Sequence, residues 1–367
     1  MAAARGYRTS VHGVENRIVR GDLHRHAEFS WDSGGGLTDG SLFDYYRYML
    51  DGAAMDFGGL TDHNSGGDYE YFWWLIEKSC DMYNVPGAFA TLYAYERSVA
   101  YPDGHRNIFH TRRGHPIVSF FTKSGLSRPR PGIAAQTGEV LENDTKLLYE
   151  SLRRTKGISI PHTSATNMGT DWRDNDPEVE PVVEIFQGDR NSSEHPGAPR
   201  AARRAEDKTI GGFREEGFLW NAYRKGIRIG SIASSDHWST HISYAMVYTE
   251  QPTREAIFNA IKKRHTYGAT DNIILDYRMG DHFMGEEFTD SSVPPLEIRV
   301  IGTSGVALVE IVKDAKVIYS TNPNQRDVKV VYRDQNVNDG TSYYYVRVVQ
   351  DDHQIAWGSP IWITRKR

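Results

Sequence analysis

Histidines and carboxylates at the ends of predicted strands are the residues whose types and spacing could do chemistry in this chain. His24 and His26 close a predicted strand at 17–24, and Glu96 closes another at 88–96. The ends of three further predicted strands carry Asp62, His63, His162, Asp236, His237 and His241. Imidazoles and carboxylates together are ligands that Zn, Mn and Fe ions accept. The pattern therefore predicts a metal site.

Each of these motifs is weak alone, and only their joint placement is specific. An HxH pair such as His24 and His26 is often surface decoration, and an aspartate beside a turn is a common turn former. In a barrel, however, all parallel strands end on one face, so residues far apart in the sequence converge there. Because potential ligands follow several of the predicted strands, they indicate one site with many ligands.

The composition narrows the function further. The 367 residues carry a net charge of -5 and one cysteine, Cys80, so an intrachain disulfide and a thiolate zinc cluster are both excluded. The basic residues form no long run, which disfavours a nucleic-acid polymer as a partner but leaves a mononucleotide substrate open. There is no apolar stretch of 18 residues, and residues 1–13 lack the apolar core of a signal peptide, so a cytoplasmic location is the default expectation.

The order of the predicted elements indicates how such a site is positioned. Strand-like and helix-like segments alternate through residue 268, with helices expected at about 39–50, 69–83, 144–157, 214–225 and 253–265. This alternation predicts an α/β fold, and seven or eight such units favour a closed barrel. Beyond it, short alternating strands predict a small antiparallel β-sandwich. The expected domains are a barrel at 1–268 and a β-sandwich at 269–367.

Six sequence segments together resemble the motifs of a known superfamily. They are "GDLHRH", "GLTDHN", "YERS", "GHRN", "ISIPHTS" and "SSDH". In combination they resemble the PHP (polymerase and histidinol phosphatase) superfamily of metal-dependent phosphoesterases. Residues 263–270, "KRHTYGAT", and 284–288, "MGEEF", are similar to its DUF3604 branch. The resemblance implies a distorted (β/α)7 TIM-like barrel with two or three divalent metal ions at the carboxyl ends of the strands.

Carried over residue by residue, the resemblance also implies which side chains hold these ions. The implied sets are His24, His26, Glu96 and Asp236 for one metal, Glu96, His105 and His162 for a second, and Asp32, His63 and a late histidine for a third.

Two of these assignments have alternatives. The family pattern commonly ends in Asp-x-His, but position 238 is tryptophan, so the late histidine is His237 or His241. Neighbouring side chains on an extended strand point apart, which favours a turn at Asp236 and leaves both histidines open. His105 lies in "GHRN" and is preferred over His110 for the second metal.

The implied activity is hydrolysis of small phosphate monoesters or diesters by a metal-bridging hydroxide, extending to other anionic esters such as sulfates. In the loop after a predicted strand, Arg190 is expected to contact the substrate anion, and His195 to protonate the leaving group. One alternative is a nucleotide phosphatase or nuclease. An alternative of another class is a non-catalytic barrel that metals stabilise, with a β-sandwich for binding or assembly.

Overall fold

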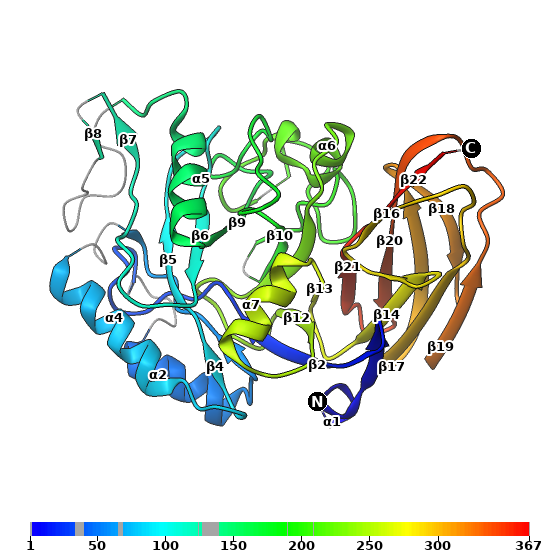
Figure 1. Cartoon of the computed structure of the whole chain (residues 1–367), viewed down its shortest axis with the longest axis horizontal. Coiled ribbons are helices and arrows are strands. Elements are labelled where there is room, and N and C mark those ends of the chain that lie inside the picture. The colour runs from blue at the N-terminus through cyan, green and yellow to red at the C-terminus, as the bar shows by residue number, and fades with distance from the viewer. Residues whose placement is uncertain are drawn as a thin grey trace.

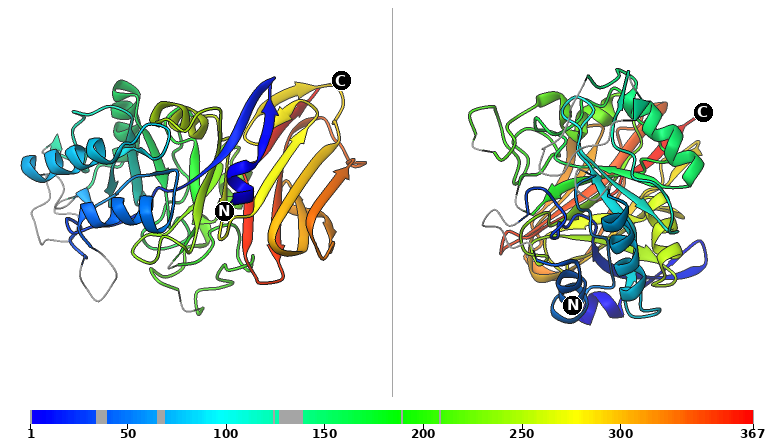
Figure 2. Two further views of the ribbon diagram at one scale, coloured as in Figure 1. Left: turned by 90° about the horizontal axis from the view of Figure 1, so that it is seen from below. Right: turned by 90° about the vertical axis from the view of Figure 1, so that its left-hand side faces the viewer.

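The computed structural model describes residues 2–33, 40–64, 69–123, 125–126, 139–188, 190–207 and 209–366. Its fold is mixed α/β with few helices, and two parts of the molecule lie side by side (Figure 1). One part, which we call the α/β part, combines short strands with helices. The other, which we call the β part, consists of strands. The N-terminal hairpin lies against the β part (Figure 2), where Arg278 donates to the Ser10 carbonyl.

The helices that the structure describes all lie in the α/β part. Its elements are α1 (Ala2–Gly6), β1 (Arg8–Val11), β2 (Val14–Asp22), α2 (Leu42–Arg47), η1 (Tyr48–Gly52), β3 (Phe57–Gly58), α4 (Glu70–Tyr83), β4 (Ala90–Thr91), β5 (Tyr93–Arg97), β6 (Arg106–His110), β7 (Phe121–Thr122), β8 (Gly125–Leu126), α5 (Asp144–Thr155), β9 (Ile158–Pro161), β10 (Val182–Gln187), η2 (Glu215–Gly217), α6 (Leu219–Arg224), β11 (Gly230–Ser234), β12 (Tyr244–Thr249), α7 (Arg254–Lys262) and β13 (Thr266–Ala269). The helices predicted from the sequence are confirmed, although α6 is shorter than expected. Within the described ranges, no helix has both the length and the apolar composition to cross a membrane.

Strand β2 is central to the α/β part. It pairs in parallel with β3, which pairs in parallel with β4, and it pairs antiparallel with both β1 and β12. At the register point Gly21↔Phe57, a Cβ on Gly21 would lie 2.5 Å from the Phe57 carbonyl oxygen. Only glycine allows this close approach of β2 and β3. The approach fixes where β2 ends, and the first predicted ligands follow that end.

The closed barrel expected from the order of elements, and the distorted (β/α)7 form that the resemblance implies, are not confirmed. The described strands pair within several sheets, among them β5-β6-β9 and β10-β11. β6 is antiparallel to both of its neighbours, β5 and β9. Its pairing with β5 is antiparallel because the eight residues 98–105 that join the two strands are too few for a helical crossover. No helix of the described chain lies between β9 and β10. In the described α/β part, the parallel strand pairs are β2-β3-β4 and β10-β11, and two isolated parallel bridges join Arg25 to Asp236 and His63 to Glu96.

The β part is built around one long strand. Its elements are β14 (Ile274–Met279), β15 (His282–Phe283), β16 (Glu287–Asp290), β17 (Leu296–Lys313), β18 (Lys316–Thr321), β19 (Gln325–Tyr332), β20 (Gly340–Gln350), β21 (Ile355–Gly358) and β22 (Ile361–Arg365). The register of β17 shifts between Ile301 and Val306, so its first half pairs with β14 and β19 and its second half with β18 and β20. All of these pairs are antiparallel, as predicted, whereas β16 and β22 of the same part pair in parallel, which the prediction did not include.

The two parts share a hydrogen-bonded sheet. β13 pairs with β12 on one side and with β21 on the other, and the expected domain boundary at 268/269 falls inside β13. Beside this junction, the buried carboxylate of Glu194 accepts hydrogen bonds from Arg347 (2.7 Å), Tyr345 (2.5 Å) and Trp357 (3.1 Å). The Trp357 ring stacks on Phe186 of β10. The α/β part therefore rests on the β part through paired backbone and a satisfied buried charge.

Candidate metal centre

His24 and His26 lie in the extended segment directly after β2, and both are buried. Because side chains alternate along an extended chain, these two point to one side and Arg25 points to the other. The Arg25 guanidinium donates to the Asp236 backbone carbonyl (2.8 Å) and lies over the Tyr45 ring. Arg25 thus links the segment after β2 to the segment after β11 on the side away from the two histidines. On the opposite side, the Nε2 atoms of His24 and His26 lie 3.2 Å apart.

The buried carboxylate of Glu96, on β5, is the point on which most of the predicted ligands converge. Its Oε2 lies 3.2 Å from Nε2 of His24 and 3.1 Å from Nε2 of His26, and its Oε1 lies 2.6 Å from Nδ1 of His105, 3.4 Å from Nε2 of His162 and 3.5 Å from Nδ1 of His63. These imidazoles follow β2, β3 and β9 or precede β6. One carboxylate therefore faces ligands from four segments, and its two oxygens face different histidines.

Asp236 provides a second carboxylate at the end of β11. Its backbone has a positive φ of 60°, so the chain turns there as the sequence suggested. The Oδ1 atom lies 3.0 Å from Nε2 of His26, 3.3 Å from that of His24 and 3.4 Å from that of His237. Because of the turn, the adjacent side chains of Asp236 and His237 both face the same space.

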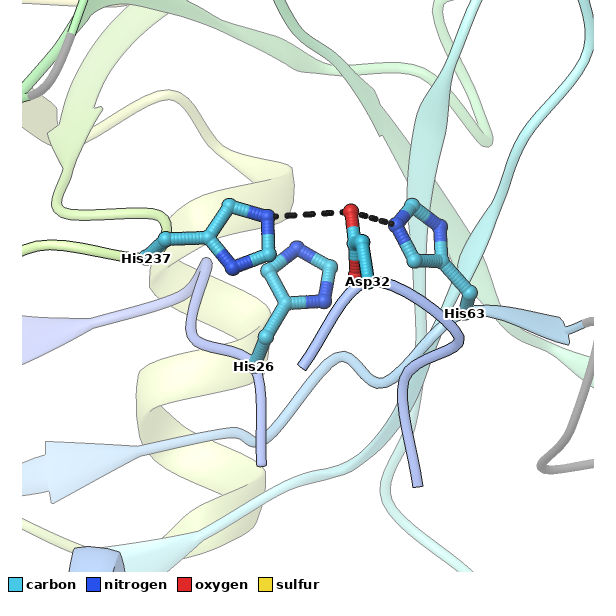
Figure 3. Close-up of side chains that lie close together, drawn as sticks. All are labelled: His26, Asp32, His63 and His237. Carbon is cyan, nitrogen blue, oxygen red and sulfur yellow. Dashed lines mark hydrogen bonds and ion pairs between the residues drawn. The ribbon is translucent and has the colours of Figure 1, made fainter. Parts of the chain in front are cut away.

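The third carboxylate, Asp32, lies between two histidines (Figure 3). Its Oδ2 atom is 3.0 Å from Nε2 of His63 and 3.2 Å from Nε2 of His237. The His26 ring stacks on the His237 ring at a centroid distance of 4.1 Å. His26 therefore lies beside both this group and the group around Asp236.

We call these nine residues the buried cluster: His24, His26, Asp32, His63, Glu96, His105, His162, Asp236 and His237. Within the described chain, ligand atoms approach within 4.8 Å of one another in three groups, which are His26, Asp32, His63 and His237; His24, Glu96 and His162; and His24, His26 and Asp236. Asp32 Oδ1 and His162 Nδ1 are buried without a hydrogen-bond partner. Unpaired buried polar atoms are costly, so the donor set fits divalent cations.

Electrostatics favour a positive charge on two histidines of the buried cluster, whereas burial, with His24 beside it, lowers the pKa of His162 to about 3. Burial opposes a charge on His24, but Glu184 and Asp236 outweigh it and raise the pKa of His24 well above its ordinary value. Burial is likewise outweighed for His26, whose pKa rises to about 10 beside Asp236 and Glu96. Burial alone would raise the pKa of Glu96, yet the neighbouring imidazoles hold it well below its usual range. Metal binding at such imidazoles would displace protons.

Several side chains that support the cluster were missed in the sequence. Buried Glu184, on β10, lies 3.0 Å from Nδ1 of His24, and the Ser30 hydroxyl lies 2.6 Å from Nδ1 of His26. Gln187 donates to Oδ2 of Asp236. Such partners fix the ring orientation of metal-binding histidines. The available signal was an acidic residue inside the otherwise apolar strand run "VVEIF".

Two of the competing histidines lie outside the buried cluster. His241 is exposed, and its Nε2 lies 2.8 Å from the hydroxyl of Tyr48. His110 is buried on β6 and stacks on His115 at 4.3 Å. Burial, with His115 beside it, lowers the pKa of His110 to about 3. The geometry therefore favours His237 over His241 and His105 over His110.

Of the two residues predicted to act on the substrate, Arg190 lies beside the buried cluster and His195 contacts α6. Arg190 Nε lies 3.4 Å from Oδ2 of Asp236, so its guanidinium borders the buried cluster. His195 stacks on Trp220 of α6 at 3.8 Å, and its Nδ1 lies 3.1 Å from the Pro196 carbonyl oxygen. No contact joins His195 to the buried cluster among the described residues. The expectation for His195 placed it by its loop alone, and packing on Trp220 turns its ring toward α6 instead.

No known family model matches the chain. An uncharacterized protein of Chlamydia pneumoniae is 26% identical over 356 residues, covering 86% of this chain and 53% of that protein. An uncharacterized protein of Chlamydia trachomatis serovar D is 26% identical over 250 residues, covering 59% of this chain and 40% of that protein. The chain thus spans about half the length, or less, of these curated relatives.

Among solved structures, the chain is similar to a two-domain protein of Bacteroides vulgatus described as containing a predicted PHP-like metal-dependent phosphoesterase. The similarity covers 96% of this chain and 97% of that chain, with a TM-score of 0.44 and 13% sequence identity.

Proposed function

We propose that this chain is a metal-dependent hydrolase of small phosphate esters. The observation that carries the proposal is the position of Glu96, whose two carboxylate oxygens face imidazoles from four segments in a buried space. A structural metal needs one closed shell of about four ligands. The buried cluster offers nine potential ligands, which suits two or three divalent ions of Zn, Mn or Fe.

The residues proposed to hold the ions are His24, His26, Asp32, His63, Glu96, His105, His162, Asp236 and His237. Divalent ions in such sites supply Lewis acidity toward phosphoryl oxygens and lower the pKa of water. With that chemistry available, the chain needs no serine or cysteine nucleophile. Its one cysteine, Cys80, is buried, and burial raises the pKa of this thiol to about 12, so it is not a nucleophile.

Arg190 is proposed to bind the substrate anion. Its guanidinium borders Asp236, and Arg190 is only partly buried, so it can reach both the cluster and a bound ester. A planar guanidinium suits two oxygens of a phosphate group. Trp31 is proposed to contact the leaving group, because its half-exposed ring lies 5.4 Å from the His63 ring. Aryl and nucleoside phosphates are therefore the first substrates to test.

The test combines metal analysis with a substrate screen. Purified protein should retain two or three equivalents of divalent metal and hydrolyse some members of a panel of phosphate monoesters, phosphate diesters and aryl sulfates. His24→Ala should lose metal and activity, and His241→Ala is the matched control because His241 lies outside the cluster. Full activity in His24→Ala, or absence of bound metal in the wild type, would refute the proposal.

A further inference from the structure

A second group of histidines surrounds a carboxylate far from Glu96 in the sequence. It consists of His12 in the turn between β1 and β2, His265 directly before β13, His282 at the start of β15, and Glu286 between β15 and β16. We call these four residues the outer cluster. His265 and Glu286 lie in the segments 263–270 and 284–288 noted in the sequence, but none of the four was assigned a role there or in the proposed hydrolysis.

Three imidazoles of the outer cluster face the two oxygens of one carboxylate. Oε1 of Glu286 lies 2.7 Å from Nε2 of His12 and 3.2 Å from Nε2 of His265, and Oε2 lies 3.5 Å from Nδ1 of His282. In the buried cluster, the corresponding separations from Glu96 run from 2.6 to 3.5 Å. The outer cluster therefore resembles the buried cluster in how imidazoles contact one carboxylate, but its ligand atoms lie farther from one another and form no fourth group within 4.8 Å in the described chain.

The backbone holds two of these residues firmly. The Glu286 amide donates to the Phe283 carbonyl, and the Glu286 carbonyl accepts from the Trp362 amide. The His265 amide donates to the Ala260 carbonyl at the end of α7, and only 9% of its side chain is exposed. Glu286 and His265 are therefore pre-positioned from the β part and the α/β part, respectively.

The side chains of the other two histidines, His282 and His12, are more exposed. The His282 ring lies flat on Phe288, with centroids 3.7 Å apart. The His12 side chain is 54% exposed, and its backbone φ of 50° precedes Gly13 at 81°. Two-residue hairpin turns with positive φ favour asparagine, aspartate or glycine at the position of His12. A histidine at this position is explained if its imidazole is needed to contact Glu286. Its exposed side chain can also reorient around a bound ion.

The arginines near Glu286 form ion pairs with a different carboxylate. Arg264 and Arg228, the closest cations in the sequence and fold, both pair with the adjacent Glu287. Within the described ranges, no arginine or lysine forms an ion pair with Glu286. A carboxylate whose recorded ion-pair partners are three imidazoles matches the four-ligand sets that bind Zn²⁺.

We propose that His12, His265, His282 and Glu286 form a separate site for one divalent transition metal ion, with Zn²⁺ as the best fit. Four protein ligands would close the shell, so this ion stabilises structure rather than reacting. It links the N-terminal hairpin, β13 and the β15–β16 segment, three places that no short sequence motif connects. The proposal does not depend on the hydrolase activity.

The experiment measures the number of Zn²⁺ and Co²⁺ equivalents that the full chain retains after loading with either metal alone. Four proteins are compared: wild type, His12→Gln, Glu286→Gln and the control His353→Gln, which changes an exposed histidine in another turn. His12→Gln and Glu286→Gln should each lose one equivalent and the corresponding part of the Co²⁺ absorption, and His353→Gln should lose none. Zn²⁺ should raise the Tm of wild type by more than that of His12→Gln.

Equal metal content and equal Co²⁺ spectra in all four proteins would overturn the proposal. His12 is exposed and glutamine is close to glutamate in size, so both variants should fold, which far-ultraviolet circular dichroism checks. The outcome is separable from that of the buried cluster. If His24→Ala retained every equivalent while His12→Gln lost one, the outer site would stand and the hydrolase proposal would fall.

Discussion

The buried and outer clusters are built from the same side chains in different surroundings. In each, imidazoles gather on the oxygens of a carboxylate at 2.6 to 3.5 Å. In the buried cluster, however, the side chains of His24 and Glu96 are 1% and 2% exposed, whereas that of His12 is 54% exposed. The difference is therefore one of burial and not of composition.

Burial makes the first cluster depend on a second layer of partners. Charges removed from water must be paired or bonded, and Glu184, Ser30 and Gln187 meet that requirement around the buried histidines. In the outer cluster, solvent can take the place of a lost partner. Removing one residue should therefore be costly in the buried cluster and mild in the outer one, and the two can be compared variant by variant.

The largest expected difference is between the two central carboxylates. Glu96→Gln should lose bound metal and lower kcat/KM for the best phosphate ester by more than about 100-fold, since even second-layer changes cost about 10- to 100-fold. Glu286→Gln should leave kcat/KM unchanged, because Glu286 lies outside the buried cluster. Steady-state kinetics and metal analysis on both variants check this. Equal losses would mean that the clusters are not functionally distinct.

The next effect separates two histidines near each other in the sequence. His237→Ala should lose at least one metal equivalent and reduce kcat/KM by more than about tenfold, because His237 faces both Asp32 and Asp236. His241→Ala should retain the metal, since its imidazole contacts only the Tyr48 hydroxyl among the interactions recorded for the described chain. Metal content decides, and the reverse result would assign the late ligand to His241.

A smaller effect is expected from the second layer, which only the buried cluster has. Glu184→Gln keeps the shape of the side chain but weakens its hold on Nδ1 of His24, so metal affinity should fall about 10-fold or more. Competition with a chelator of known affinity measures this change. Glu310→Gln, which alters a carboxylate bound to Arg347 in the β part, is the control and should show wild-type affinity. Indistinguishable affinities would leave Glu184 with a packing role.

Arg190 tests whether the buried cluster receives an anion. Arg190→Ala should raise KM for the phosphate ester about tenfold, as expected for one lost hydrogen bond to a charged group, with a smaller change in kcat. Arg326→Ala, an exposed residue of β19, is the control. Unchanged KM in Arg190→Ala would remove Arg190 from the substrate site.

The smallest effect is expected at His195. Because its ring stacks on Trp220 and does not reach the buried cluster, His195→Ala should leave kcat and its pH profile unchanged. A profile that loses its alkaline limb in this variant would restore His195 as the proton donor.

Residues that the sequence motifs proposed as ligands lie close together in the structure, whereas the fold that carries them was predicted less well. His24, His26 and Glu96 were recognisable because each closes a strand, and the turn at Asp236 followed from the need for adjacent side chains to face one site. The closed barrel was not confirmed, because the short β5–β6 connection forces antiparallel pairing. Local periodicity does not report how strands pair across long distances.

The residues that the sequence did not reveal share one property. Glu184 is an acidic residue inside an apolar strand run, but the sequence does not show which side chain it contacts. His12 and Glu286 are separated by more than two hundred positions and meet only when the N-terminal hairpin packs beside the β part. Spacing in the sequence cannot show a contact made by tertiary packing.

The placement of β13 between β12 and β21 also has a consequence for how the chain folds. The strand order is β2-β12-β13-β21, so β2, which is synthesised early, belongs to the same sheet as residues 355–358, which are synthesised much later. Pairing between such distant segments slows folding, and an early strand that waits for its sheet is open to wrong partners. Refolding should therefore end with a slow phase in which the late strands complete the sheet.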